Sequence, residues 1–255
     1  MTKFHWMDRE YNVRDESFVT TLEDSGYDSI FLTFDYGHGD NFGKAYHLLK
    51  THNRLGVTVA LRPEMVNVGY GAMILKPFVE EFKDRFALNL ITGELDQPEK
   101  AVFKVHHELT VQRQLMKDFA KNLREVYGDD LPRLWVKGSS FQGVDAVTDG
   151  HGDGLFNHLN QAIIVHKNVP ALKAKKTMVR AFLLITETSE EAQKIWDDFP
   201  MGNMKLSTLC GTKDEVIAQM ESYEDFVTDW AISAPLVGEA SIEAIHDLVT
   251  TRTKR

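Results

Sequence analysis

Short hydrophobic runs alternate with longer segments in which hydrophobic positions recur every three or four residues, and this alternation continues along the chain. The short runs are typical of the buried strands of a parallel sheet, and the longer segments are typical of amphipathic helices that cover it. Eight strand–helix units can be counted in this way. The expected strands are residues 3–7, 29–33, 57–61, 86–91, 133–136, 154–156, 178–185 and 226–231.

Repeated strand–helix units predict one α/β barrel rather than a sandwich or a pair of domains. The chain has 255 residues, 43% of them hydrophobic, which is enough for a (β/α)8 barrel with a sizeable core. No stretch rich in Pro, Gly or Ser and no internal repeat divides it. We therefore predict a single (β/α)8 TIM barrel that spans residues 1–255.

Two acidic segments are predicted to begin helices. Residues 15–17 (Asp-Glu-Ser) and 188–191 (Thr-Ser-Glu-Glu) provide N-cap side chains and early carboxylates. Such groups satisfy free backbone N–H groups and favour the positive end of a helix. We interpret both segments as structural.

The charge of the chain argues against nucleic acid as a partner. A net charge of −9 and a pI near 5.6 provide no basic surface for nucleic acid, so a small organic substrate is the better expectation. The single cysteine, Cys210, excludes an internal disulfide and a thiolate metal cluster, and is expected to be buried. No hydrophobic segment resembles a secretory signal or a membrane span. We expect a cytoplasmic protein without a membrane partner.

In a barrel of this kind, ligands bind at the carboxyl ends of the strands. The expected strand at 133–136 runs into Gly138, Ser139 and Ser140, and a helix is expected to begin near Gln142. Two hydroxyls and several free N–H groups at a helix N-terminus suit a phosphate. An ordinary Ser-capped turn would have the same sequence.

A second strand end carries an amide, a hydroxyl and a glycine, at Asn89, Thr92 and Gly93. These groups suit the polar edge of a flavin ring, because glycine permits close approach to the backbone. A simple strand-to-loop corner is the alternative interpretation.

Two arginines are candidates for binding an anion. Arg62 follows the expected strand at 57–61, and Arg180 lies within the strand at 178–185. A guanidinium in either place could hold an anionic substrate or stabilise an oxyanion. A structural ion pair is the alternative at both positions.

Two glycine-rich segments, residues 37–40 and 150–154, both contain a Gly-His-Gly-Asp sequence. Two His-x-Asp pairs could in principle form a hydrolytic metal site. Glycine-rich loops are the simpler interpretation, and we predict no metal.

Taken in order along the chain, six segments resemble the luciferase-like flavin-dependent monooxygenases, and most closely the alkanesulfonate monooxygenase branch. The segments are Val-Ala-Leu-Arg-Pro at 59–63, Arg-Phe-Ala-Leu-Asn-Leu-Ile-Thr-Gly at 85–93, His-His-Glu at 106–108, Gly-Ser-Ser at 138–140, Ile-Thr-Glu-Thr-Ser-Glu-Glu-Ala at 185–192 and Leu-Cys-Gly-Thr-Lys-Asp-Glu-Val at 209–216. The resemblance implies a (β/α)8 barrel that binds reduced FMN from a separate flavin reductase, or the deazaflavin F420. It also implies a homodimer.

The resemblance implies roles for individual residues. It places the cofactor phosphate at Gly138, Ser139 and Ser140, and the polar edge of the ring at Asn89, Thr92 and Gly93. His106 matches the histidine of a helix-opening motif, and we count it among the cofactor-binding residues. Arg180 matches a strand arginine that binds substrate or flavin, and His38 stands where the alkanesulfonate enzymes have a cysteine. We take Arg180, His38 and Arg62 as the catalytic candidates.

The function that the resemblance implies is that of a two-component monooxygenase. Such an enzyme uses reduced FMN and O2 to oxidise a small organic substrate, with an anionic, sulfonate-like molecule as the first candidate. The alternative is a flavin-binding protein without catalytic activity. Departures from the family favour this alternative, because Leu109 and Thr110 replace an Arg-Tyr pair and Phe182 replaces a histidine.

Overall fold

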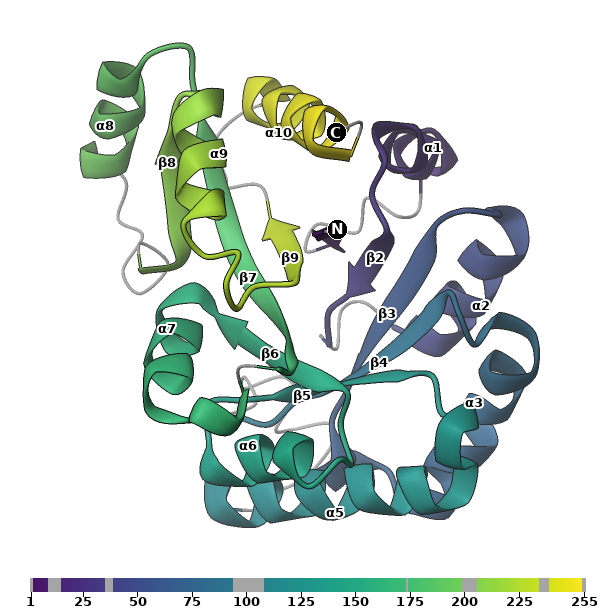
Figure 1. The fold of residues 1–255 in the computed structure, drawn as a ribbon. Coiled ribbons are helices and arrows are strands. Elements are labelled where there is room, and N and C mark those ends of the chain that lie inside the picture. The colour runs from purple at the N-terminus through teal and green to yellow at the C-terminus, as the bar shows by residue number, and fades with distance from the viewer. Residues whose placement is uncertain are drawn as a thin grey trace.

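The computed structural model describes residues 2–8, 15–34, 39–93, 108–172, 174–198, 206–233 and 239–253. In Figure 1 these residues form a ring of strands with helices around it. The catalytic candidate His38 and the cofactor-binding candidate His106 lie outside the described residues.

Eight parallel strands close the barrel, because β6 pairs with β7, β7 with β9, and β9 with β1. The prediction of a (β/α)8 barrel is therefore confirmed. The strands of the barrel are β1 (Lys3–Asp8), β2 (Ser29–Leu32), β3 (Gly56–Leu61), β4 (Phe86–Leu90), β5 (Arg133–Lys137), β6 (Gly154–His158), β7 (Lys176–Ile185) and β9 (Asp229–Ser233).

Apart from shifts of one or two residues at other strand ends, two details differ from the sequence prediction. A short additional strand, β8 (Thr208–Gly211), pairs with the last four residues of β7. The last barrel strand begins at Asp229 rather than at Phe226, because the hydrophobic residues before it belong to a turn in which Phe226 N–H donates to Tyr223 O. Hydrophobicity alone does not separate such a turn from the strand that follows it.

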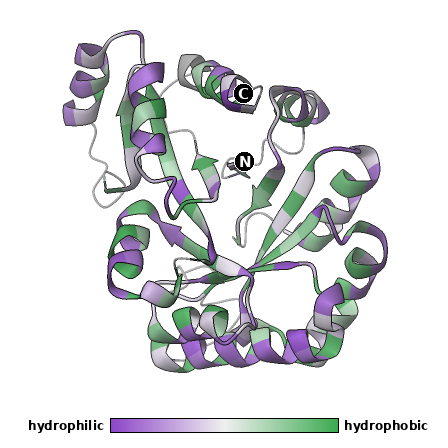
Figure 2. Cartoon of the chain, viewed as in Figure 1, coloured by the Kyte–Doolittle hydropathy of each residue, from purple (hydrophilic) through white to green (hydrophobic). Residues whose placement is uncertain are grey.

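Helices follow the strands and cover the outside of the barrel. They are α1 (Glu16–Ser25), α2 (Asn41–Thr51), α3 (Val68–Phe82), α5 (Leu109–Tyr127), α6 (Phe141–Thr148), α7 (Leu159–Asn168), α8 (Ser189–Asp198), α9 (Lys213–Glu221) and α10 (Glu239–Thr253). Figure 2 shows hydrophobic residues concentrated on the strands, while the helices carry both kinds of residue. In α5 the buried positions include Met116, Phe119 and Leu123, which recur at helical spacing.

The predicted helix starts are confirmed. The Asp15 carboxylate accepts a hydrogen bond from Ser17 N–H at the start of α1, at 2.8 Å. The Thr188 hydroxyl accepts one from Glu191 N–H at the start of α8, at 3.2 Å. Both contacts satisfy N–H groups that have no partner inside the helix.

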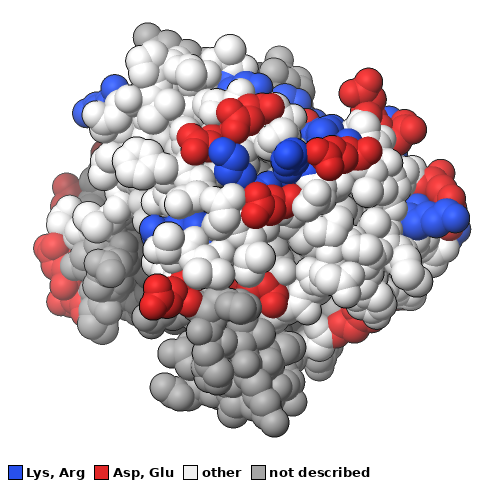
Figure 3. Space-filling model, turned by 90° about the horizontal axis from the view of Figure 1, so that it is seen from below, with Lys and Arg blue, Asp and Glu red and all other residues white. Residues whose placement is uncertain are grey.

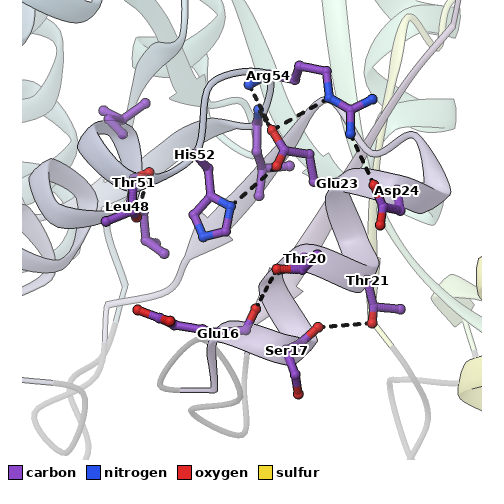
Figure 4. Close-up of polar contacts among 12 residues, drawn as sticks. Glu16, Ser17, Thr20, Thr21, Glu23, Asp24, Leu48, Thr51, His52 and Arg54 are labelled. Atoms are coloured by element: carbon purple, nitrogen blue, oxygen red, sulfur yellow. Dashed lines mark hydrogen bonds and ion pairs between the residues drawn. The ribbon is translucent and has the colours of Figure 1, made fainter.

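The end of α1 is tied to the segment that leads into β3 (Figure 4). The Glu23 carboxylate accepts hydrogen bonds from the backbone N–H groups of Arg54 and Leu55, at 2.7 and 3.1 Å, and contacts His52 Nδ1 at 3.3 Å. Burial alone would raise the pKa of Glu23, but these hydrogen bonds lower it overall. A carboxylate thus fixes the entry to β3 at the amino-terminal end of the barrel.

The interior of the barrel has an apolar middle between two polar ends. Six buried side chains form the middle: Met7, Phe31, Ala60, Trp135, Met178 and Ala231. Inward-facing residues at the amino ends of the strands, such as His5, Ser29 and Asp229, are polar and buried. Arg62 is polar and buried at the opposite end. The apolar middle therefore separates two polar cavities.

The surface carries mixed charge. On the face drawn in Figure 3, acidic and basic side chains are interspersed rather than separated into patches of one sign. Among the described residues, none of the helices has the length and apolar character that crossing a bilayer requires.

Candidate functional site

A cavity of about 310 Å³, which we call the mouth cavity, lies at the carboxyl-terminal end of the barrel. Met7, Phe31 and Ala60 of the apolar middle line it, together with polar residues from several strand ends. Five residues predicted from the sequence meet there: Arg62, Asn89, Thr92, Gly93 and Arg180. The rule that ligands bind at the strand ends of a barrel therefore selected residues that lie far apart in the sequence but line one cavity.

The corner after β4 is held by three side chains. Arg62 donates a hydrogen bond to the carbonyl oxygen of Gly93, and Lys137 Nζ donates one to the carbonyl of Thr92 at 3.0 Å. Gln112 Oε1 accepts a hydrogen bond from Gly93 N–H at 3.1 Å. Gly93 has a φ of 137°, which side chains rarely adopt, so glycine is needed at this corner.

Arg62 is both a cavity residue and a member of a buried ion pair. Its Nε lies 2.9 Å from Glu64 Oε1, and the two side chains are 5% and 0% exposed. Its guanidinium also lies over the ring of Phe34, 5.8 Å from the centroid. Glu64 was not singled out in the sequence, although it lies only two residues from Arg62.

Arg180 lies on the inner face of β7 and lines the same cavity. Its guanidinium lies over the ring of Phe182, 4.9 Å from the centroid. Phe182 stands where the resemblance expects a histidine, so in this chain an aromatic face supports the strand arginine.

Two buried carboxamides in the cavity have no hydrogen-bond partner among the described residues. Asn89 is 0% exposed and Asn157 is 2% exposed, and both amide atoms of each are unpartnered. Leaving a buried polar group unsatisfied costs about 1–3 kcal/mol, so such groups mark places where a ligand can supply the missing partners. Asn157 was not predicted from the sequence, and neither was Gln161, whose Oε1 is also unpartnered.

The Gly138–Ser140 turn adjoins this cavity without lining it. A Cβ atom at Gly138 would lie 2.8 Å from Asn157 Nδ2, so the turn approaches β6 closely. Ser140 caps α6, because its hydroxyl accepts a hydrogen bond from Gly143 N–H at 3.2 Å, and Ser139 is exposed. The helix begins at Phe141, as the sequence suggested to within one residue.

Lys137 connects the turn to the cavity, since it is the last residue of β5 and its side chain lines the cavity. Burial lowers the pKa of Lys137, and the charges of Arg62, Arg113 and Arg180 lower it further. Lys137 was not predicted from the sequence. The available signal was a charged residue at the end of a hydrophobic strand, directly before Gly-Ser-Ser.

The two glycine-rich His-x-Asp segments use their aspartates structurally. Asp40 caps α2, where its carboxylate accepts hydrogen bonds from Phe42 and Gly43 N–H at 3.0 and 3.1 Å. Asp153 accepts one from Leu134 N–H at 2.7 Å and pairs with Arg124 at 3.0 Å. Within the described ranges, no three His, Cys, Asp or Glu side chains are grouped as metal ligands.

A second cavity, of about 580 Å³, lies at the amino-terminal end of the barrel. His5 lines it and is buried between Ser29 Oγ, 2.6 Å from Nδ1, and Asp229 Oδ1, 2.9 Å from Nε2. Burial alone would raise the pKa of Asp229, but the hydrogen bond and charge of His5, with help from Thr228 and Arg133, lower it overall. Polar groups at this end of a barrel contribute to stability rather than to ligand binding.

Comparisons with known proteins identify the fold. No family model matches the sequence, and no curated protein matches it. Solved structures resemble it over nearly their whole length. The EDTA monooxygenase EmoA from Chelativorans sp. BNC1 has a TM-score of 0.80 at 11% identity, over 99% of this chain and 93% of that one.

Two further structures extend the likeness. The riboflavin lyase RcaE, solved with modified FMN and riboflavin, has a TM-score of 0.74 at 14% identity, over 100% of this chain and 91% of that one. The F420-dependent tetrahydromethanopterin reductase from Methanopyrus kandleri has a TM-score of 0.72 at 10% identity, over 98% of this chain and 97% of that one. The chain therefore has the (β/α)8 barrel fold of luciferase-like enzymes. Identities this low establish the fold alone.

Proposed function

We propose that the protein is a flavin-dependent monooxygenase that uses reduced FMN and O2 to oxidise a small organic substrate. The observation that carries this proposal is the mouth cavity, in which the carboxamides of Asn89 and Asn157 are buried without partners. Neighbours of the same fold were solved with FMN or named as monooxygenases, which supports a flavin as the missing partner. A fold alone does not define a function, so the proposal depends on this site.

The residues present fit a flavin. Asn89 offers an unsatisfied donor and acceptor for the polar edge of the ring, and Thr92 and Gly93 lie beside it in the same cavity. The Gly138–Ser140 turn offers an exposed hydroxyl and the start of α6 for the phosphate. When bound, reduced FMN supplies the electrons with which O2 is activated. F420 is a second candidate for the same place, since a structural neighbour uses it.

The chain's own residues would bind the cofactor and the substrate, orient them, and exclude water. Arg62 fixes the corner at Gly93 by a hydrogen bond to its carbonyl oxygen, and so holds the ring-binding segment in place. Phe31 and Phe156 stack with ring centroids 5.0 Å apart beside the cavity, where they keep water from its floor. Arg180 would hold the substrate against the cofactor.

We propose an anionic, sulfonate-like molecule as the substrate. Three cations line the cavity, namely Arg62, Lys137 and Arg180, and no Asp or Glu is among the described residues that line it. A separate flavin reductase would supply the reduced cofactor, because the sequence has no dinucleotide-binding fingerprint of its own.

The test combines a spectrum with an assay. Purified protein is titrated with FMN and, separately, with F420, and is then mixed with reduced FMN, O2 and a panel of sulfonates, sulfones and aldehydes. We expect one FMN to bind per chain and a product that contains oxygen from O2. Tight FMN binding without any product would support the non-catalytic flavin-binding alternative, and absence of FMN and F420 binding would contradict both.

A further inference from the structure

The mouth cavity is cationic although the protein is acidic. The chain carries a net charge of −9, yet the charged side chains that line this cavity are Arg62, Lys137 and Arg180, as far as the structure describes them. Cations gathered in a concave, poorly solvated site attract anions more strongly than the same charges at the surface.

Lys137 has no carboxylate partner among the described residues, whereas Arg62 in the same cavity has one. Arg62 is paired with Glu64, and lysines elsewhere, such as Lys83 and Lys213, pair with Asp130 and Asp247 at 2.8 Å. Within the described part of the chain, no carboxylate forms an ion pair with Lys137. Its one hydrogen bond there goes to the carbonyl of Thr92. An ammonium has three N–H donors, so two remain for a ligand.

An ammonium that is partly removed from water and has no counter-ion is costly, unless an anion offsets its charge or its pKa falls. The surroundings of Lys137 add positive charge, since the charges of Arg62, Arg113 and Arg180 all act against its ammonium. His158 lines the same cavity and adds no negative charge, and the carboxylate of Glu64 is already held by Arg62. No described residue that lines the cavity supplies a negative charge to Lys137, and an anionic ligand would supply one.

We propose that Lys137 is an oxyanion-binding residue, whose ammonium contacts a sulfonate, phosphate or carboxylate group of the bound ligand and so determines which ligands the cavity selects. This inference deepens the proposed function but does not depend on turnover. The oxyanion could belong to the substrate or to the cofactor phosphate, because Lys137 faces the cavity and also directly precedes the Gly138–Ser140 turn.

A purely structural role for Lys137 makes a different prediction. If Lys137 only supported the corner at Thr92, its removal would weaken anionic and neutral ligands alike. If its charge contacts the ligand, only the anionic member of each matched pair would lose affinity. Two substitutions separate these roles. Lys137→Met removes the charge and the hydrogen bond, whereas Lys137→Gln removes the charge and keeps an N–H donor.

The experiment measures binding by calorimetry with two matched pairs of ligands. One pair is hexanesulfonate and hexyl methyl sulfone, and the other is FMN and riboflavin. The wild-type protein is compared with Lys137→Met, Lys137→Gln, Lys137→Arg and the control Lys176→Met, which removes an exposed lysine from the opposite end of the barrel.

We expect both uncharged variants to weaken the anionic member of one pair by about tenfold to a hundredfold, as for a lost charge-assisted hydrogen bond, while its neutral partner changes little. Loss for hexanesulfonate assigns the oxyanion to the substrate, and loss for FMN assigns it to the cofactor phosphate. Lys137→Arg should retain the discrimination, and Lys176→Met should bind like the wild type.

Equal losses for both members of each pair would overturn the inference, and so would a wild-type protein that does not discriminate between them. Because each variant is judged by the ratio of two affinities, a poorly folded variant cannot imitate the expected result. A wild-type protein that discriminates but forms no product would contradict the proposed function and leave the assignment of Lys137 standing.

Discussion

Both ends of the barrel interior bury polar side chains, but the network around His5 at one end is satisfied, whereas two carboxamides at the other end are not. At the amino-terminal end, His5 lies between Ser29 and Asp229 in a complete network. At the carboxyl-terminal end, Asn89 and Asn157 are buried without partners in the described structure, and Lys137 has no carboxylate beside it there. Buried polar groups are costly unless paired, so the difference separates a region that stabilises the fold from the region where we propose that a ligand binds.

The largest expected effect concerns the satisfied end. Asp229→Asn breaks a buried ion pair whose side chains are 5% and 3% exposed, and should lower the free energy of unfolding by about 3–5 kcal/mol. Urea denaturation measures this change. Asp84→Asn, which alters an exposed carboxylate lining the same cavity, should change stability by less than about 0.5 kcal/mol. Equal changes in stability for Asp229→Asn and Asp84→Asn would contradict a stabilising role of the buried ion pair.

The Gly138–Ser140 turn should show the opposite behaviour. Changes there should act mainly on FMN binding rather than on folding. Ser139→Ala should weaken FMN binding by about 1.5–3 kcal/mol, the contribution of a hydrogen bond to a charged group, and leave stability unchanged because Ser139 is exposed. Ser140→Ala should in addition lower stability by about 1 kcal/mol, because it removes the N-cap of α6. An unchanged dissociation constant for FMN in the variant that carries both Ser139→Ala and Ser140→Ala would contradict the assignment of the phosphate to this turn.

Asn89→Leu tests whether the unsatisfied carboxamide in the mouth cavity lowers the stability of the free protein and favours ligand binding. Replacing an unsatisfied buried amide with a hydrocarbon of similar size should raise the free energy of unfolding by about 1 kcal/mol, while FMN binding weakens. Thermal unfolding and an FMN titration measure the two changes. A loss of stability comparable to that of Asp229→Asn would show that Asn89 belongs to a satisfied network after all.

The smallest effect is a pH dependence at Glu23, again at the amino-terminal end. The pKa of Glu23 is lowered in the folded protein, so its contribution is present above its ordinary value near 4.5 and is lost as the pH falls through the folded value. Glu23→Gln should cost about 1 kcal/mol at pH 7, and the difference from the wild type should shrink below about pH 4. A difference that stays constant with pH would contradict this origin.

Much of the fold follows from the sequence, because burial of parallel strands leaves a clear hydrophobic pattern. The pattern failed at β8, where four residues pair only with the carboxyl-terminal end of β7. It also failed at the start of β9, where Phe226 and Val227 are hydrophobic but precede the strand. Both failures occur where hydrophobicity does not separate a strand from a packed turn.

The candidate site was predictable only in part. Arg62, Asn89 and Arg180 were found because strand ends in a barrel converge, which is a property of topology. Asn157 was missed because what distinguishes it is burial without a partner, and Lys137 because what distinguishes it is the lack of a carboxylate beside it. Both features depend on contacts from other strands. The sequence marks Lys137 only by its place at the end of a hydrophobic strand, and it does not show these contacts.

The central claim is that the unsatisfied end of the barrel holds a flavin. A crystal structure of the protein soaked with FMN tests it most directly. We predict ring density in the mouth cavity within hydrogen-bonding distance of Asn89, with the phosphate at Gly138–Ser140. FMN bound in the amino-terminal cavity beside His5, or a mouth that stays empty at saturating FMN, would contradict the account.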